Sequence, residues 1–142
     1  MLSQKTKYAL KALLYLAQQE EGYIARTIEI AEGANIPKKF LEQILLELKR
    51  GHFVSSKQGK LGGYYLIKSK STITLADIHR LFDGAIALLP CASLNFYEPC
   101  VDCKTESECL LRLGLIAVRE KTLVAMEGIT IASLEKKKKN IF

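Results

Sequence analysis

The four cysteines are the side chains of this 142-residue sequence that are best suited to chemistry, and all of them fall in its second half. They are Cys91, Cys100, Cys103 and Cys109. No apolar run reaches membrane-spanning length and residues 1–18 lack the pattern of a signal peptide, so we expect a cytoplasmic protein without membrane contact. In the reducing cytosol such cysteines indicate metal binding or redox chemistry rather than structural disulfides.

Other kinds of chemistry have few candidates in this sequence. The two histidines, His52 and His79, are expected at a helix end and at a surface or half-buried position, not as ligands. No Ser/His/Asp set, phosphate-binding loop or paired-carboxylate site is evident. The Cys100–Cys103 pair follows Pro99 in a predicted loop, without the strand–helix context of a thioredoxin-like oxidoreductase. We therefore expect a protein that is not an enzyme.

The net charge of +6 is unevenly distributed along the chain. Residues 1–70 hold 12 Lys and Arg against 6 Asp and Glu, a balance of +6, whereas residues 71–142 hold 9 against 9. A basic first half favours binding to the phosphates of a nucleic acid. A solvated basic surface explains the same asymmetry, so charge alone does not decide between the two.

The stretch from Asn35 to Arg50 predicts a helix that begins at Pro37, because proline at the first helical position gives up only an unpaired N–H. Its apolar face comprises Phe40, Leu41, Ile44, Leu45 and Leu48. Its opposite, N-terminal corner carries Lys38, Lys39, Glu42 and Gln43. A helix that buries one face and offers basic and amide side chains at its start suits the groove of a DNA duplex.

The residues before this helix indicate a helix-turn-helix. Residues 4–19 and 27–33 read as helices, the second with Thr27 as its N-cap. A small residue, Ala31, lets two helices approach, Asn35 tolerates the left-handed backbone of a turn, and Leu41 anchors the second helix. This spacing is typical of a helix-turn-helix.

The residues after the helix predict a β-hairpin. Gly51 is expected to end the helix, and residues 53–56 and 64–67 read as short strands. The loop between the strands, Lys57–Gly63, contains three glycines and two lysines, so it can approach a backbone closely and donate to phosphates. A plain hairpin is the alternative for the loop alone, but its place after a helix-turn-helix favours a wing.

The C-terminal half predicts helices separated by the cysteine loop. A helix over 75–82 is capped by Thr74, residues 85–104 form a loop, and Thr105–Glu108 reads as a capping box for a helix to Glu127. That long helix is apolar on more than one face, which favours a second chain against it. A last turn over 130–134 precedes a basic, frayed tail at 136–139.

These elements predict a mainly α fold with a small β-hairpin wing. We expect a winged helix-turn-helix domain at residues 1–84, a cysteine-bearing sensor loop at 85–104, and a dimerisation helix with a basic tail at 105–142.

The sequence resembles the IscR- and NsrR-type winged-helix transcription regulators of bacteria over nearly its whole length. The residues that carry the resemblance are Lys7-Tyr8-Ala9-Leu10, Phe40-Leu41-Glu42-Gln43-Ile44-Leu45, Gly62-Gly63-Tyr64 and the cysteine loop before a long helix. The resemblance implies a homodimer that binds a palindromic DNA operator. The predicted recognition helix would enter the major groove, and the wing would enter the adjacent minor groove.

The resemblance also implies which residues face DNA. In the helix these are Lys38, Lys39, Glu42 and Gln43; in the wing they are Lys57, Gln58, Gly59, Lys60, Gly62 and Gly63. Glutamate can accept from cytosine and glutamine can pair with adenine, whereas the helix lysines fix the register on phosphates. Many relatives carry arginine where this sequence has Gln58.

Relatives that bind an iron–sulfur cluster use three cysteines, which correspond here to Cys91, Cys103 and Cys109. The fourth ligand of those relatives is a His or an Asp, at positions that hold Arg112 and Lys7 in this sequence. The sequence departs from the family at this ligand, and Cys100 is the natural substitute, which would give ligation by four thiolates. Zinc binding, a thiol–disulfide switch, and a cysteine–metal module that binds a protein instead of DNA remain open alternatives.

Overall fold

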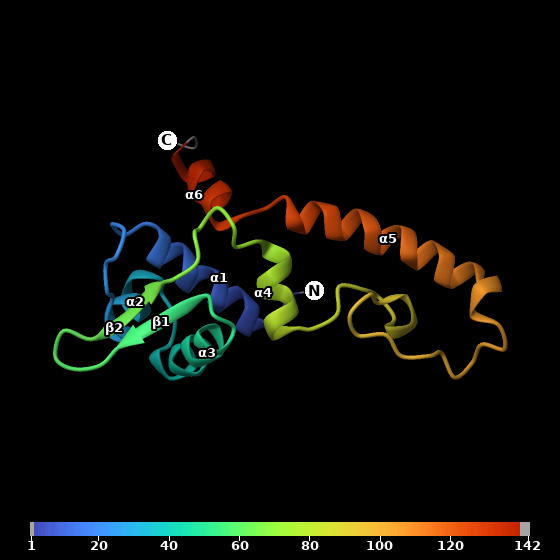
Figure 1. The fold of residues 1–142 in the computed structure, drawn as a ribbon, viewed down its shortest axis with the longest axis horizontal. Helices are drawn as coiled ribbons and strands as arrows, with labels where there is room; N and C mark the ends of the chain where they lie inside the picture. Colours follow the sequence, from blue (N-terminus) through green and yellow to red (C-terminus); the bar gives the residue numbers. More distant parts are fainter. Residues whose placement is uncertain (1, 140–142) are drawn as a thin grey trace.

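A computed structural model describes residues 2–139, which form an N-terminal module with a long arm (Figure 1). The elements in order are α1 (Gln4–Ala17), α2 (Thr27–Gly33), α3 (Lys38–Arg50), β1 (Val54–Lys57), β2 (Gly63–Leu66), α4 (Leu75–Phe82), η1 (Pro90–Ala92), η2 (Glu106–Glu108), α5 (Leu110–Glu127) and α6 (Ile131–Lys139). The predicted fold class, mainly α with one small hairpin, is confirmed. None of the helices in this described part is long and apolar enough to span a bilayer.

The core of the module is built by α1, α2 and α3. Leu41, Ile44, Leu45 and Leu48 of α3 are almost completely buried together with the apolar side of α1. Asn35 adopts φ 51° in the turn between α2 and α3, and Ala31 is buried there, so the helix-turn-helix prediction is confirmed. The prediction that Phe40 lies on the buried face is wrong: its ring lies beside the half-buried Tyr8 ring, with much of its surface exposed.

Several predicted boundaries move by one or two residues. Helix α1 ends at Ala17, two residues before the predicted end. Pro37 is the N-cap of α3 rather than its first residue. The N-cap of α2 is Arg26, and Thr27 is its first residue. The backbone N–H of Arg26 donates to the Glu29 carboxylate at 2.6 Å. This contact gives a backbone N–H at the start of α2 a hydrogen-bond partner without a capping hydroxyl group. At the end of α3 the left-handed residue is His52, with φ 60°, and not Gly51.

The hairpin is antiparallel and pairs Val54 with Leu66 and Lys57 with Gly63, so both strands are shifted one residue from the prediction. Its second strand also bonds to the segment before α2, since the N–H and C=O of Ala25 pair with those of Tyr64 at 2.9 and 2.8 Å. A Cβ at Gly63 would collide with the Ala25 carbonyl, so glycine is required where the hairpin joins the module.

The arm consists of α5 and the loop that runs alongside it from α4 (Figure 1). Two arginines of α5 hold the loop: Arg112 Nε donates to the Cys91 carbonyl at 2.9 Å and Arg119 Nη1 to the Ala92 carbonyl at 2.6 Å. The predicted capping box is wrong, because Glu106–Glu108 forms a separate 3₁₀ turn and Cys109 is the N-cap of α5.

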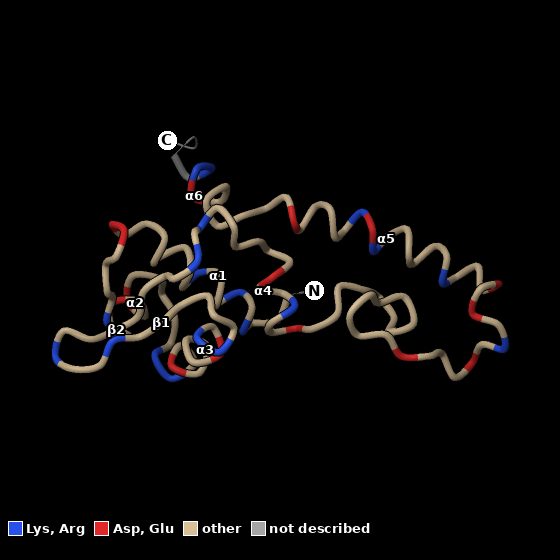
Figure 2. Tube along the Cα trace, in the orientation of Figure 1, with Lys and Arg blue, Asp and Glu red and all other residues tan. Residues whose placement is uncertain are grey.

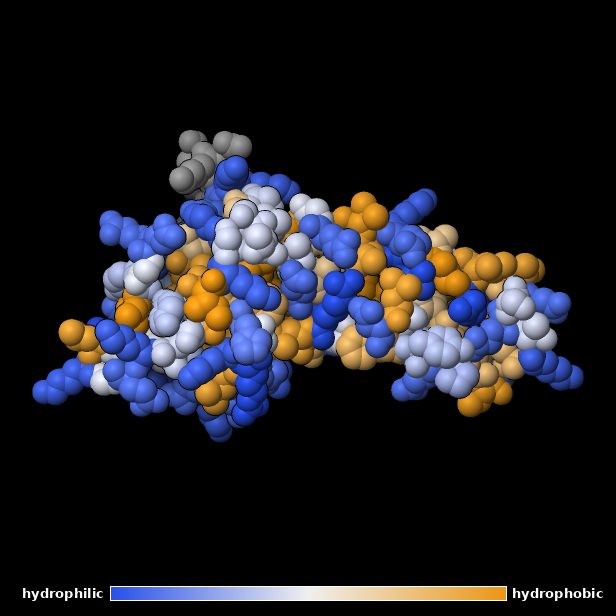
Figure 3. All heavy atoms as spheres, in the orientation of Figure 1, coloured by the Kyte–Doolittle hydropathy of each residue, from blue (hydrophilic) through white to orange (hydrophobic). Residues whose placement is uncertain are grey.

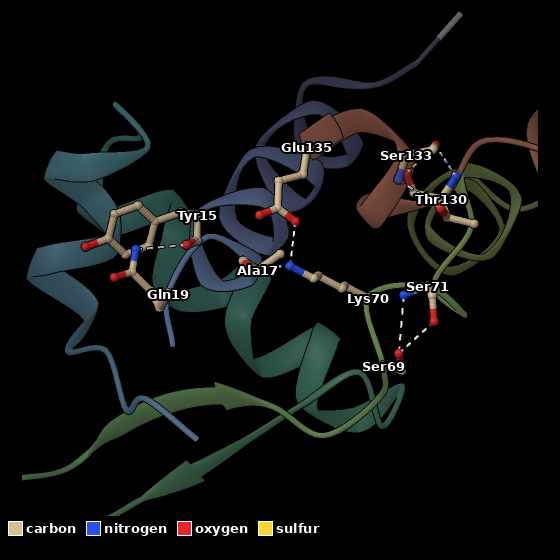
Figure 4. Close-up of polar contacts among 9 residues, drawn as sticks. All are labelled: Tyr15, Ala17, Gln19, Ser69, Lys70, Ser71, Thr130, Ser133 and Glu135. Atoms are coloured by element: carbon tan, nitrogen blue, oxygen red, sulfur yellow. Dashed lines mark hydrogen bonds and ion pairs between the residues drawn. The ribbon is translucent and has the colours of Figure 1, made fainter. Parts of the chain in front are cut away.

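Helix α6 returns from the arm to the module and extends to Lys139, so the prediction of a short turn followed by a frayed tail is wrong. The Thr130 hydroxyl accepts from the backbone N–H of Ser133 at 3.1 Å and starts the helix. Lys70 then joins α6 to α1, donating to the Glu135 carboxylate at 2.6 Å and the Ala17 carbonyl at 3.2 Å (Figure 4). The chain therefore closes on the module rather than leaving it.

Candidate nucleic-acid interface and cysteine site

The first two turns of α3 present the polar residues that the sequence predicted at a DNA interface. Lys38, Lys39, Glu42 and Gln43 are all exposed. Lys38 and Glu42 lie one turn apart with 3.9 Å between the ammonium and the carboxylate. Because both side chains are largely in water, this pair constrains them only weakly. Both are therefore free to exchange that contact for one with a ligand.

Helix α3 is oriented in the module mainly by its buried apolar face, and three exposed polar contacts add to this. Lys5 of α1 pairs with Glu47 at 3.2 Å, and Lys49 donates to the Ser56 hydroxyl of β1 at 2.7 Å. Lys11 donates to the Asn35 carbonyl at 2.9 Å, directly before α3. Together with the buried apolar face, these contacts hold the exposed face of α3 in one direction. A fixed face is a requirement for recognition of a rigid duplex.

The loop of the hairpin extends away from the core (Figure 1). Lys57, Gln58, Gly59 and Lys60 are exposed, and Gly62 and Gly63 are half-buried at its base. A Cβ at Gly62 would collide with the Lys57 carbonyl, so the tight turn depends on this glycine. Lys and Arg positions are found both at this loop and along α3 (Figure 2). The loop can thus bring the ammonium groups of Lys57 and Lys60, and the backbone of its glycines, close to an anionic surface.

Three exposed residues on these two elements are not among those predicted from the sequence. Leu46 and Arg50 lie further along α3, and Leu61 is 88% exposed at the tip of the loop. The sequence already contained a pattern that could have drawn attention to Leu46. It lies seven residues after Lys39 on the polar side of the helix, where a leucine is out of pattern.

A partly buried carboxylate joins the module to the start of the arm. Asp83, at the end of α4, accepts from the Ser3 backbone N–H at 3.1 Å, the Thr6 hydroxyl at 2.7 Å and His79 Nδ1 at 3.2 Å. Burial opposes ionisation of Asp83, but the hydrogen bonds outweigh it and lower its pKa to about 2. His79 Nε2 lies 3.2 Å from the Ala85 carbonyl oxygen, so the same cluster contacts the first residue of the arm.

Three of the four cysteines lie together at the far end of the arm. The thiols of Cys100 and Cys109 lie beside that of Cys103 and raise its pKa to about 12, since they stabilise its protonated form. Cys109 accepts from the backbone N–H of Arg112 at 3.4 Å, and this contact lowers the pKa of the Cys109 thiol. Cys91 does not join them; it is buried in η1, with Arg112 bonded to its carbonyl.

The segment that carries these cysteines is held by Glu106. Its carboxylate accepts from the Tyr97 hydroxyl at 2.6 Å and from the backbone N–H of Cys100 at 3.0 Å. The Tyr97 hydrogen bond, and then that of Cys100, lower the pKa of Glu106. The loop therefore has an internal framework although few of its residues are buried.

Four cysteines are suitable ligands for a soft metal, but their positions in the structure match a metal site only in part. Thiolates suit iron–sulfur clusters and zinc, and Cys100, Cys103 and Cys109 are neighbours. Within residues 2–139, however, no three His, Cys, Asp or Glu side chains converge as metal ligands. The Cys91 thiol is also not among the groups that shift the pKa of Cys103 or Cys109. The four thiols as arranged here do not form one ligand set.

Comparison with known proteins identifies the family. The model of the Rrf2 family, described as iron-dependent transcriptional regulators, matches residues 2–137. The chain belongs to the Rrf2 family. An rrf2-like HTH-type transcriptional regulator of Rhodobacter capsulatus is 42% identical over 137 residues, which cover 94% of this chain and 91% of that relative. The Rrf2 family is a family of transcription regulators, which is not an enzyme class.

Solved structures agree with this assignment. The structure of CymR, the global cysteine regulator of B. subtilis, matches with a TM-score of 0.74 and 25% identity over 96% of this chain and 97% of its own. IscR of T. potens has the same TM-score at 22% identity, over 97% and 88% of the two chains, and shows the shared fold. The winged-helix fold of an Rrf2 regulator and the resemblance to IscR-type proteins are thereby confirmed.

Proposed function

We propose that this Rrf2 protein regulates transcription as a homodimer that binds a palindromic DNA operator, with its cysteine loop as the sensor. The observation that carries the proposal is that one module combines the exposed, polar start of α3 with an exposed hairpin loop rich in glycine and lysine. We infer that α3 enters the major groove, where Glu42 and Gln43 meet base edges, and that Lys38 and Lys39 contact phosphates.

The hairpin loop takes the adjacent minor groove in this proposal. Lys57 and Lys60 neutralise phosphates on its two sides, and Gln58 occupies the position before Gly59. Gly59, with φ 105°, and the tight base at Gly62 and Gly63 let the backbone approach the duplex closely. Without an arginine at position 58, affinity in this groove comes from charge rather than from sequence recognition.

The homodimer part of the proposal is supported by α5. None of its residues is buried, and one side of the helix carries an exposed stripe composed of Leu110, Leu113, Gly114, Ala117, Val118 and Val124. We call these six residues the α5 stripe. Apolar side chains recur along the arm (Figure 3). A helix that is apolar on its outer face needs a covering surface, and its small residues allow a second helix to approach closely.

The sensor part of the proposal is an iron–sulfur cluster held by thiolates of Cys91, Cys100, Cys103 and Cys109. Such a cluster would respond to iron supply, oxidants or nitric oxide by assembling, changing charge or being lost. The support is the all-thiol donor set in a family described as iron-dependent. Zinc and a thiol–disulfide switch are the alternatives, and the absence of three converging metal ligands within residues 2–139 favours the switch.

This proposal divides the chain by role. Residues 1–84 bind DNA, residues 85–104 sense, and residues 105–142 pair the two chains, with α6 tying the pairing helix back to the module. The Asp83 cluster connects the loop to α1. The chain's own residues can thus transmit a change in the loop to the position of α3 in the dimer.

The DNA-binding part is tested by selection from a pool of random-sequence duplexes, followed by anisotropy titration of the selected duplex. We expect a selected, palindromic sequence and an affinity that falls steeply with salt. Replacing Lys57–Gly63 with a two-residue turn should abolish that binding while sedimentation still reports a dimer. Failure to select any sequence would favour a module that binds proteins instead, whereas retained affinity after the replacement would show that the hairpin loop does not contact the duplex.

The sensor part is tested by purification without oxygen, visible absorption and assays of iron, sulfide and zinc. Iron and sulfide with a coloured protein support the cluster, whereas a colourless, iron-free protein excludes it. Zinc bound in place of iron selects the zinc alternative. Cys100→Ser should lose the metal if Cys100 is the fourth ligand, and retention of the full metal content would assign that ligand elsewhere.

A further inference from the structure

The polar face of α3 contains one apolar residue that the fold does not require. Leu46 is 46% exposed, whereas Leu41, Leu45 and Leu48 of the same helix are fully buried. A single exposed leucine is ordinary on a protein surface. This one stands in the row of exposed side chains formed by Lys39, Gln43 and Arg50.

The other large apolar residue exposed on α3 is accounted for by α1. The ring of Phe40 lies 6.4 Å from that of Tyr8, and Glu47 on the same side of the helix pairs with Lys5 at 3.2 Å. Phe40 therefore faces the neighbouring helix. Leu46 lies on the other side of the exposed face, toward Lys39 and Glu42, because residues three, four and seven apart share one side of a helix.

The spacing of this row matches a recognition helix that lies in the major groove. Lys39, Glu42, Gln43 and Leu46 are at positions i, i+3, i+4 and i+7. Homeodomain recognition helices read the major groove with residues at this same spacing. The helical rise places Leu46 about 4.5 Å beyond Gln43 along the axis, which is on the order of one base-pair step.

The chemistry of the groove specifies what a leucine could contact there. The C5-methyl of thymine is the apolar group that base pairs present in the major groove, while glutamine forms two hydrogen bonds with adenine. We propose that Leu46 is a specificity-determining residue that packs on a thymine methyl group, next to the base pair contacted by Gln43. This proposal rests on the proposed function and names one contact that the DNA site must contain.

The probe is the duplex selected from the random pool, with each thymine replaced in turn by deoxyuridine, which lacks only the methyl group. At one position in each half-site, the replacement should weaken binding of the native protein about fourfold, the effect of uncovering one methyl group. Leu46→Ala should bind the thymine and uracil duplexes equally. Leu46→Met, which keeps an apolar side chain of similar length, should retain the difference.

Leu61→Ala is the matched control, because it also removes an exposed leucine from an element that faces DNA. It should change affinity for both duplexes by the same factor and leave their ratio intact. The proposal is wrong if the native protein binds all uracil duplexes as well as the thymine duplex, or if Leu46→Ala keeps the native ratio. Those results leave the proposed function standing, whereas failure to select any sequence removes the proposed function itself.

Discussion

Helices α3 and α5 differ in what they pack against. Helix α3 buries four large apolar side chains in the core of the module, and the polar residues on its other face are left exposed. Helix α5 is longer, yet none of its residues is buried, and Leu110 is 83% exposed. The module can therefore be stable within one chain, while the arm gains most of its stability only when a second surface covers it.

This difference matches the roles we propose for the two regions. Recognition of a rigid duplex requires side chains held in fixed positions, and the packed module holds α3 by its core and by three polar contacts. A sensor must change state at low cost, and segments with few buried contacts open most easily. The cysteines lie on such a segment, held mainly by Glu106 and two arginines of α5.

The largest expected effect is the loss of a core side chain from α3. Leu45→Ala should lower the free energy of unfolding by about 2–5 kcal/mol, because it leaves a cavity in the fully buried core. Urea unfolding followed by circular dichroism measures it, at a protein concentration low enough to keep the chain monomeric. Leu110→Ala, on the exposed arm, should change the same quantity by less than about 0.5 kcal/mol. Equal losses would contradict the comparison.

The next effect concerns the α5 stripe. Leu113→Lys should weaken the dimer at least about 100-fold, because a twofold axis places the charge in the interface twice. Sedimentation velocity over a range of concentrations measures the dissociation constant. Leu61→Lys makes the same substitution at the hairpin tip and should leave the dimer unchanged. A native chain that is monomeric at all concentrations would refute the proposed role of the arm.

Much of the module could be predicted from the sequence because its signals are local. The 3.6-residue apolar pattern of α3, the left-handed Asn35 and the glycines of the hairpin loop each specify structure within a few residues. The predictions for the module that were wrong or incomplete concern features that depend on tertiary contacts. Phe40 fits the apolar pattern, but its exposure is decided by where α1 passes, and the Ser3–Asp83 bond joins residues far apart in sequence.

The arm was less predictable for a related reason. The sequence indicated a loop and a long helix, but α6 folds back through the Lys70–Glu135 pair, which local patterns do not encode. The capping-box pattern at Thr105 was overridden by Cys109, the residue that caps α5. Spacing likewise could not indicate that Arg112 contacts both the Cys91 carbonyl and the Cys109 thiol, or that no three metal ligands converge within residues 2–139.

A smaller effect is expected where the two regions meet. Asp83→Asn should lower the free energy of unfolding by about 1–2 kcal/mol near neutral pH, because hydrogen bonds from Ser3 and Thr6 favour the charged carboxylate. The pKa of Asp83 is lowered in the folded state, so this stability is present above the unfolded pKa of about 4 and is lost as pH falls toward about 2.

Urea unfolding of the native chain and Asp83→Asn at a series of pH values measures this difference. The two stabilities should converge as the solution is acidified below about pH 4. Asp77→Asn is the control, since Asp77 caps the same helix through contacts with Thr74 but does not touch α1. A difference between native chain and Asp83→Asn that stays constant down to low pH would show that the carboxylate charge is not what joins the regions.

The smallest expected effect is the loss of one positive charge, which should matter for DNA binding in the module but not in the arm. Lys60→Ala should lower affinity for the selected duplex only a few-fold, but it should reduce the slope of log affinity against log salt by about 1, because one phosphate contact is lost. Lys104→Ala removes an exposed lysine from the arm and should leave the slope unchanged. Anisotropy titrations at several salt concentrations measure both. If the two variants change the slope equally, the duplex contacts the arm as well as the module. That result would contradict the proposal that the module alone binds DNA.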